Sequence, residues 1–110
     1  MNPRIESLEK MLNGPRDGAL LRFSLGNEYL KADDPAKAAK CFQEAVDRDK
    51  HYSAAWKALG KTLVDTNQPE AALAVYEQGI TVAEARGDIQ AAKEMTVFAK
   101  RIKKAQGNPG

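Results

Sequence analysis

The stretch that decides the fold is residues 53–79, "SAAWKALGKTLVDTNQPEAALAVYEQG". Gly60 and Gly79 lie in segments that otherwise have the composition of helices, although a glycine inside a helix costs about 1 kcal/mol relative to alanine. Apolar residues recur there three and four positions apart, on one helix face. This spacing is shown by Trp56, Leu59 and Leu63 and again by Ala72, Tyr76 and Ile80. We therefore expect two paired helices whose backbones approach closely at the glycines, with bulky side chains filling the space beside them.

The same pattern occurs once more, 34 residues earlier. Residues 19–52 can be laid over residues 53–86, and the positions that agree are the small and bulky residues at helical spacing. These pairs are Leu25 and Leu59, Gly26 and Gly60, Pro35 and Pro69, Ala38 and Ala72, Phe42 and Tyr76, Ala45 and Gly79, and Val46 and Ile80. Four identities in 34 positions decide nothing by number, so the prediction depends on which positions agree.

These residues resemble the tetratricopeptide repeat, a helix–turn–helix unit of 34 residues. The second copy has Trp56-x2-Leu59-Gly60 followed by Ala72-x3-Tyr76, and the first has Leu25-Gly26-x2-Tyr29 followed by Ala38-x3-Phe42. The first copy departs from the family at Arg22, where a large apolar residue is usual, and both copies lack the late proline. The resemblance implies an all-α superhelix built from two tandem hairpins.

Turn and cap residues divide the chain into six expected helices within one domain, residues 1–110. Asp34-Pro35 and Gln68-Pro69 are typical helix starts, and Asp33 and Asn67 occupy the slots where a left-handed backbone often ends a helix. A helix over 3–12, stopped by Asn13-Gly14-Pro15, is expected at one end of the two repeats. A second capping helix is expected over 89–105, followed by a frayed tail at 107–110.

Composition narrows the class of protein. The chain is 43% apolar and 29% charged with a net charge of +2, as in an ordinary globular protein, and it has no apolar run long enough to span a membrane. The first residues lack the apolar core of a signal peptide, so a cytoplasmic location is expected. We find no motif for a catalytic centre, a cofactor or a metal, and predict that the protein is not an enzyme.

Three features with potential chemistry have simpler explanations. Cys41 is the only cysteine and has no nearby histidine to activate it, which indicates a small packing residue. His51 is expected in a loop, as a solvated or capping residue. Turn and cap chemistry explains Asp33-Asp34 without a bound cation.

The resemblance implies that the functional surface is a concave groove lined by the first helix of each pair. Carried over residue by residue, this set contains apolar and basic or amide side chains. It consists of Leu20, Phe23, Asn27, Leu30, Ala54, Lys57, Lys61 and Val64, with Lys93 as a candidate addition. Such a groove suits a peptide or helix of another protein that carries acidic side chains or a C-terminal carboxylate. A simpler alternative is that Leu20, Phe23 and Leu30 contact the N-terminal helix or the curved interior, and that Lys57 and Lys61 are merely solvated.

Two other functions remain open from the sequence. Residues 89–105 carry five basic residues against Glu94, and Lys100, Arg101, Lys103 and Lys104 form a candidate nucleic-acid surface, although no aromatic residue is interleaved with them. Exposed apolar edges of the caps would instead pair two chains into a homo-oligomeric scaffold. The expected oligomeric state is a monomer or a weak homodimer.

Overall fold

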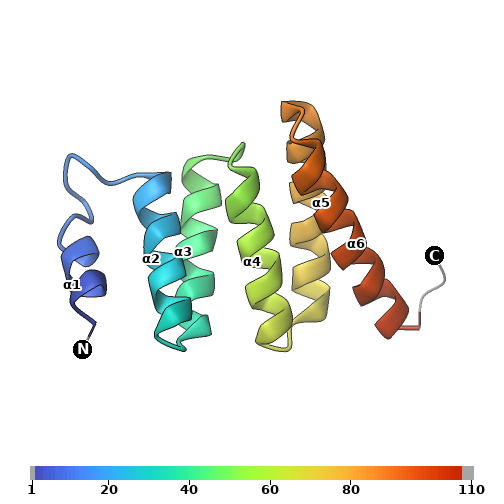
Figure 1. The fold of residues 1–110 in the computed structure, drawn as a ribbon, viewed down its shortest axis with the longest axis horizontal. Coiled ribbons are helices and arrows are strands. Elements are labelled where there is room, and N and C mark those ends of the chain that lie inside the picture. Colours follow the sequence, from blue (N-terminus) through green and yellow to red (C-terminus); the bar gives the residue numbers. More distant parts are fainter. Residues whose placement is uncertain (1, 108–110) are drawn as a thin grey trace.

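The computed structural model describes residues 2–107, which form six α-helices and no β-strand. The helices stand in a row from α1 at the N-terminal end to α6 at the C-terminal end (Figure 1). Their bounds are α1 Pro3–Glu9, α2 Ala19–Lys31, α3 Pro35–Arg48, α4 Ser53–Asp65, α5 Pro69–Arg86 and α6 Ile89–Ala105. The expected all-α solenoid of about six helices is therefore confirmed.

Each helix packs mainly against the next one along the chain. The pairs α2–α3 and α4–α5 form two hairpins, α3 packs on α4, and α6 packs on α5 and also touches α4. The molecule measures 46 × 29 × 18 Å, and its radius of gyration of 14.4 Å exceeds the roughly 13 Å typical of a compact domain of this length. The chain is thus an elongated stack with separate cores between neighbouring helices.

Two glycines allow the helices of each hairpin to approach closely. A Cβ atom built on Gly26 would lie 2.4 Å from Cε1 of Phe42, and one on Gly60 would lie 2.4 Å from Cε1 of Tyr76. Both rings are almost completely buried. The free energy that glycine costs in a helix is offset because each ring packs directly on a bare backbone.

The two hairpins meet around Trp56. Its Cβ would lie 2.8 Å from a Cβ built on Gly79, and its indole Nε1 donates a hydrogen bond to the carbonyl of Lys50 at 2.8 Å. The side chain packs against the apolar core of the first hairpin and against the core that contains Tyr76 and Met95. Trp56 therefore joins neighbouring units of the stack.

The turns follow the residues predicted for them. Asp33 and Asn67 have φ values of 58° and 60°, in the left-handed region, and Gly87 has a φ of 75° at the end of α5. Asp34 and Asp88 cap α3 and α6 by accepting hydrogen bonds from the backbone N–H groups of Lys37 and Ala91. These caps satisfy donors that the first turn of a helix leaves without partners.

The N-terminal helix is shorter than the 3–12 predicted. Helix α1 ends at Glu9, and the backbone then tightens, with Leu12 N–H donating to the Glu9 carbonyl. The chain turns at Asn13, which has a φ of 65° and donates its N–H to Asp17 Oδ2 at 2.8 Å. The regular four-residue hydrogen bonds already stop at Met11, whose N–H donates to the Leu8 carbonyl, and Asp17 then satisfies the N–H of Asn13 beyond this tight turn. Leu12 still packs against the core between α1 and α2.

None of the helices within residues 2–107 has the length and apolar character needed to cross a membrane. Of the tail expected at 107–110, residues 108–110 lie outside the described part of the chain.

Candidate partner-binding surface

The residues expected to line a groove on α2 are not covered by α1. Leu20 is 69% exposed and Leu30 is 37% exposed, and Asn27 between them is half-buried. Phe23 is partly buried by aromatic neighbours, with ring centroids 5.7 Å from Phe42 and 5.0 Å from Tyr52. Instead of reaching these residues, α1 packs through Ile5 and Leu8 on a different part of the hairpin, around Leu25 and Cys41.

The residues expected on α4 are accessible as well. Ala54, Lys61 and Val64 are exposed, and Val64 keeps 43% of its surface in contact with solvent. Lys57 is half-buried because its Nζ donates to Glu94 Oε2 at 2.7 Å, across to α6. This bond from Lys57, with a second from Gln90, lowers the pKa of Glu94. We call the eight residues Leu20, Phe23, Asn27, Leu30, Ala54, Lys57, Lys61 and Val64 the groove face.

A hollow of about 220 Å³ lies at the C-terminal edge of the groove face, between α4, α5 and α6. Its polar wall carries Lys61, Arg101 and the carboxylate of Asp65. The remaining lining residues are Val64, Tyr76, Phe98 and Ile102. Phe98 packs on Tyr76 with ring centroids 5.6 Å apart, and the Arg101 guanidinium lies 5.7 Å from the centre of the Phe98 ring. The hollow thus combines two cations with an aromatic floor.

Lys93 lies in a different hollow from Lys61. It lines a space of about 480 Å³ at the C-terminal end of the stack, together with Ile89 and Val97. Glu94, the next residue, is the one that contacts Lys57. The structure therefore extends the groove face toward α6 through Glu94, Phe98 and Arg101.

The basic residues near the end of α6 point in several directions. Arg101 lies over Phe98 beside the groove face, and Lys103 Nζ is 3.8 Å from Glu77 Oε2 on α5. Lys100 and Lys104 are exposed. Phosphate binding depends on several cations that follow one backbone, so this spread does not favour the nucleic-acid alternative.

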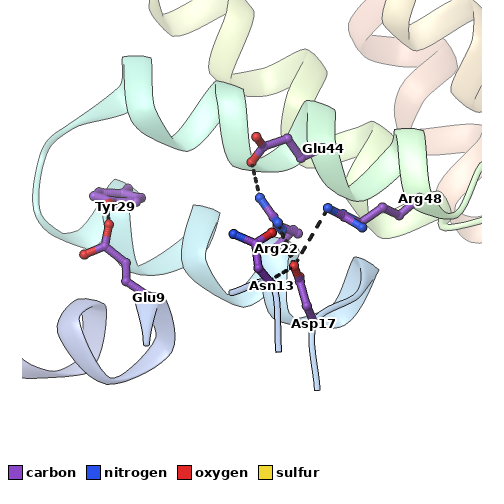
Figure 2. Close-up of polar contacts among 7 residues, drawn as sticks. All are labelled: Glu9, Asn13, Asp17, Arg22, Tyr29, Glu44 and Arg48. Carbon is purple, nitrogen blue, oxygen red and sulfur yellow. Dashed lines mark hydrogen bonds and ion pairs between the residues drawn. The ribbon is translucent and has the colours of Figure 1, made fainter. Parts of the chain in front are cut away.

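A buried ion cluster around Arg22 was not predicted from the sequence. Arg22 is 8% exposed and grips the carboxylate of Asp17 with two hydrogen bonds, at 3.0 Å from Nε and 2.7 Å from Nη2. Its Nη1 donates to Glu44 on α3 at 3.1 Å, and Arg48 approaches Asp17 to 3.8 Å (Figure 2). The bonds from Arg22, with the one from the Asn13 N–H, hold the pKa of Asp17 far below its usual range.

The cluster explains why an arginine stands where the family has a large apolar side chain. The side chain is buried like an apolar one, and its guanidinium ties the loop before α2 to α3. The clue in the sequence was the departure at Arg22 itself, but the partner Glu44 is 22 residues away and no spacing rule connects them.

Helix α1 is held against α2 by a polar contact that is separate from the Arg22 cluster. Tyr29 donates its hydroxyl hydrogen to Glu9 Oε2 at 2.6 Å (Figure 2). The hydrogen bond to Glu9, with partial burial, raises the pKa of Tyr29 to about 12. Nearby, Glu28 is buried and pairs with Arg4 of α1 at 3.4 Å. Helix α1 is therefore held by apolar packing and by polar contacts at two points.

Cys41 is buried between α1 and the first hairpin, as expected of a packing residue. Burial raises the pKa of its thiol to about 11. At pH 8 the thiolate fraction is then roughly a hundredfold smaller than for an unperturbed thiol. We expect native Cys41 to react with a disulfide reagent at least ~100-fold more slowly than the urea-unfolded chain. Equal rates, followed by absorbance of the released thiolate, would show that the thiol is accessible.

A family model and a relative of similar sequence place the chain in the same family. The tetratricopeptide repeat family model matches residues 23–89. The TPR repeat-containing protein PA0015 of Pseudomonas aeruginosa is 47% identical over 102 residues, which cover 93% of this chain and 97% of that protein.

Solved structures agree with the fold. The solution structure of protein BPP2914 from Bordetella parapertussis has a TM-score of 0.79 and 39% identity, covering 96% of this chain and 91% of that one. The solution structure of a tetratricopeptide repeat domain protein from Salinibacter ruber has a TM-score of 0.75 and 28% identity. It covers 84% of this chain and 92% of that one.

Proposed function

Because this chain belongs to the tetratricopeptide repeat family, whose fold generally mediates contacts between proteins, we propose that it is a non-catalytic binding module. Its groove face takes an extended peptide or a helix of a partner protein. Residues 1–110 act as one unit in this proposal, and a cytoplasmic location remains a prediction.

The observation that carries the proposal is the exposure of apolar side chains on the groove face. Within residues 2–107, five large apolar residues stay exposed, and Leu20, Leu30 and Val64 are three of them. The chain's own terminal helices leave them accessible: α1 packs elsewhere, and α6 meets α4 through the bond between Lys57 and Glu94. Exposed apolar side chains rimmed by polar ones are typical of a protein interaction site.

Charge favours an acidic partner. Lys61 and Arg101 flank the hollow at the edge of the groove face, and among the described residues Asp65 is the one acid that lines it. A side-chain or terminal carboxylate there would receive hydrogen bonds from both cations, while an adjacent apolar side chain enters over Phe98. Lys57 contributes less to the binding of an acidic partner, because its Nζ already donates to Glu94.

The triple variant Asn27→Ala, Lys57→Ala, Lys61→Ala tests the groove face. We expect it to lose partner capture by at least tenfold, because it removes two cations and an amide, and to keep the helical circular dichroism of the native chain. The measurement is quantitative affinity capture from cells of the source organism, with native and variant proteins at equal loading.

A matched control removes the same kinds of side chain from other surfaces. Lys40→Ala, Lys50→Ala, Gln78→Ala deletes two exposed lysines and one exposed amide on α3, the following loop and α5. It should capture the same proteins as the native chain. Retained capture by the groove variant, or equal loss in both variants, would count against this surface.

A further inference from the structure

The end of the stack beyond α6 presents an uncovered helix face. In the two hairpins the first helix is covered by the second, α2 by α3 and α4 by α5. Helix α6 packs on α5 as α4 packs on α3, so it stands where the first helix of another hairpin would be. No helix follows α6 within the described residues (Figure 1). Ile89 and Val97 on this side are 54% and 47% exposed.

This face is hollowed and apolar near the start of α6. The space of about 480 Å³ at the end of the stack is lined by residues from α6 and the last turns of α5. They are Glu84, Ile89, Ala92, Lys93, Thr96 and Val97. Small side chains line its floor, at Ala92 and Thr96, so a neighbouring helix could approach closely there.

Lysines continue the same face along α6. Lys93, Val97, Lys100 and Lys104 follow one another at four- and three-residue spacing, which places them on one side of the helix. All three lysines are exposed, and none is within 4 Å of a carboxylate among the described residues, unlike Lys57 and Lys103. We call Ile89, Lys93, Thr96, Val97, Lys100 and Lys104 the terminal stripe.

We propose that the terminal stripe docks an amphipathic helix of a partner protein, with aliphatic residues on one side and glutamates or aspartates flanking them. The aliphatic side chains cover Ile89 and Val97, and the acids pair with Lys93, Lys100 and Lys104. This surface is distinct from the groove face, so one chain would hold two partners or two segments of one partner.

Charge argues against a second copy as the occupant. In a twofold dimer the same patch meets itself, so three lysines of each chain would lie near those of the other. The single negative charge of Glu84, which lines the hollow, is too small to neutralise these lysines. Apolar Ile89 and Val97 stand where a nucleic-acid site would need further cations or stacking rings.

The test uses an 18-residue acetylated and amidated helical peptide with leucine at three- and four-residue spacing and glutamate on the flanks. A scrambled peptide of the same composition is the reference. Titration into the 15N-labelled protein should shift the amides of the terminal stripe. Lys93→Glu, Lys100→Glu should weaken binding at least tenfold, whereas Lys10→Glu, Lys40→Glu, which changes the charge equally at the other end, should change it less than twofold.

The groove variant Asn27→Ala, Lys57→Ala, Lys61→Ala should bind the peptide like the native chain, so the two surfaces are tested separately. Four results would overturn the proposal: shifts confined to the groove face, equal affinity for the scrambled peptide, a native dimer that Val97→Asp dissociates, or tighter binding of a single-stranded RNA 18-mer at the terminal stripe.

Discussion

Replacing Gly60 with leucine is expected to lower the free energy of unfolding by about 1–3 kcal/mol. A Cβ at this position would lie 2.4 Å from Cε1 of Tyr76, well inside contact distance. The ring cannot swing away freely, because it is buried and packs against Phe98 and the core of the second hairpin. Urea unfolding followed by circular dichroism gives the free energy, and an unchanged slope shows that both proteins unfold in the same way.

Ala71→Leu is the matched control, because Ala71 is an exposed helical residue on α5. Its effect should stay within about 0.5 kcal/mol. If Gly60→Leu were no more harmful than Ala71→Leu, close packing of the ring on the helix backbone would be the wrong explanation for the glycine. A second check is Tyr76→Leu, which opens space beside residue 60, so that the combined variant loses less than the sum of the two.

Arg22→Ala should lower the midpoint of thermal unfolding by about 5–10 °C. The change leaves the buried carboxylate of Asp17 with only the Asn13 N–H at 2.8 Å and Arg48 at 3.8 Å, and it deprives Glu44 of its partner. It also detaches the loop before α2 from α3. Arg16→Ala is the control, since Arg16 is exposed in the same loop and should change the midpoint by less than ~2 °C.

The effect of Arg22→Ala depends on pH in a defined direction. The folded pKa of Asp17 is lowered, so its contribution to stability is complete above the unfolded value of about 3.9 and is lost as the pH falls toward the folded pKa. The difference in stability between native protein and variant should therefore be constant from pH 5 to 7 and shrink below pH 4. A difference that grows in acid would exclude the ionised Asp17 as the cause.

The hairpins could be predicted from the sequence because their determinants are local. Glycine and the ring that covers it lie 16 residues apart in each repeat, at Gly26 and Phe42 and at Gly60 and Tyr76, and the turn residues lie between them. The end of α1 could not be predicted in this way. Met11 and Leu12 donate to carbonyls three residues back instead of four, and the side chain of Asp17, from the following loop, then accepts the N–H of Asn13.

The surface was less predictable than the fold. The helix faces place Leu20, Leu30 and Val64 together but leave open whether Leu20 and Leu30 are buried, and the partner of Lys57 depends on how α6 is rotated against α4. The repeat register slips in the long helix α5, so the sequence does not decide between Lys93 and Glu94. The ion cluster of Arg22 was missed for a similar reason, because Glu44 comes from a neighbouring helix.

Trp56 is an intrinsic fluorescent probe of the junction between the two hairpins. The single tryptophan is held between the two hairpins, with its indole N–H bonded to the backbone of the connecting loop. Its emission therefore changes when water reaches that junction, even while both hairpins keep their helical content. A red shift of the Trp56 emission before ellipticity is lost would show that the two hairpins separate while they are still helical. Coincident unfolding curves from fluorescence and ellipticity would show that the hairpins unfold together.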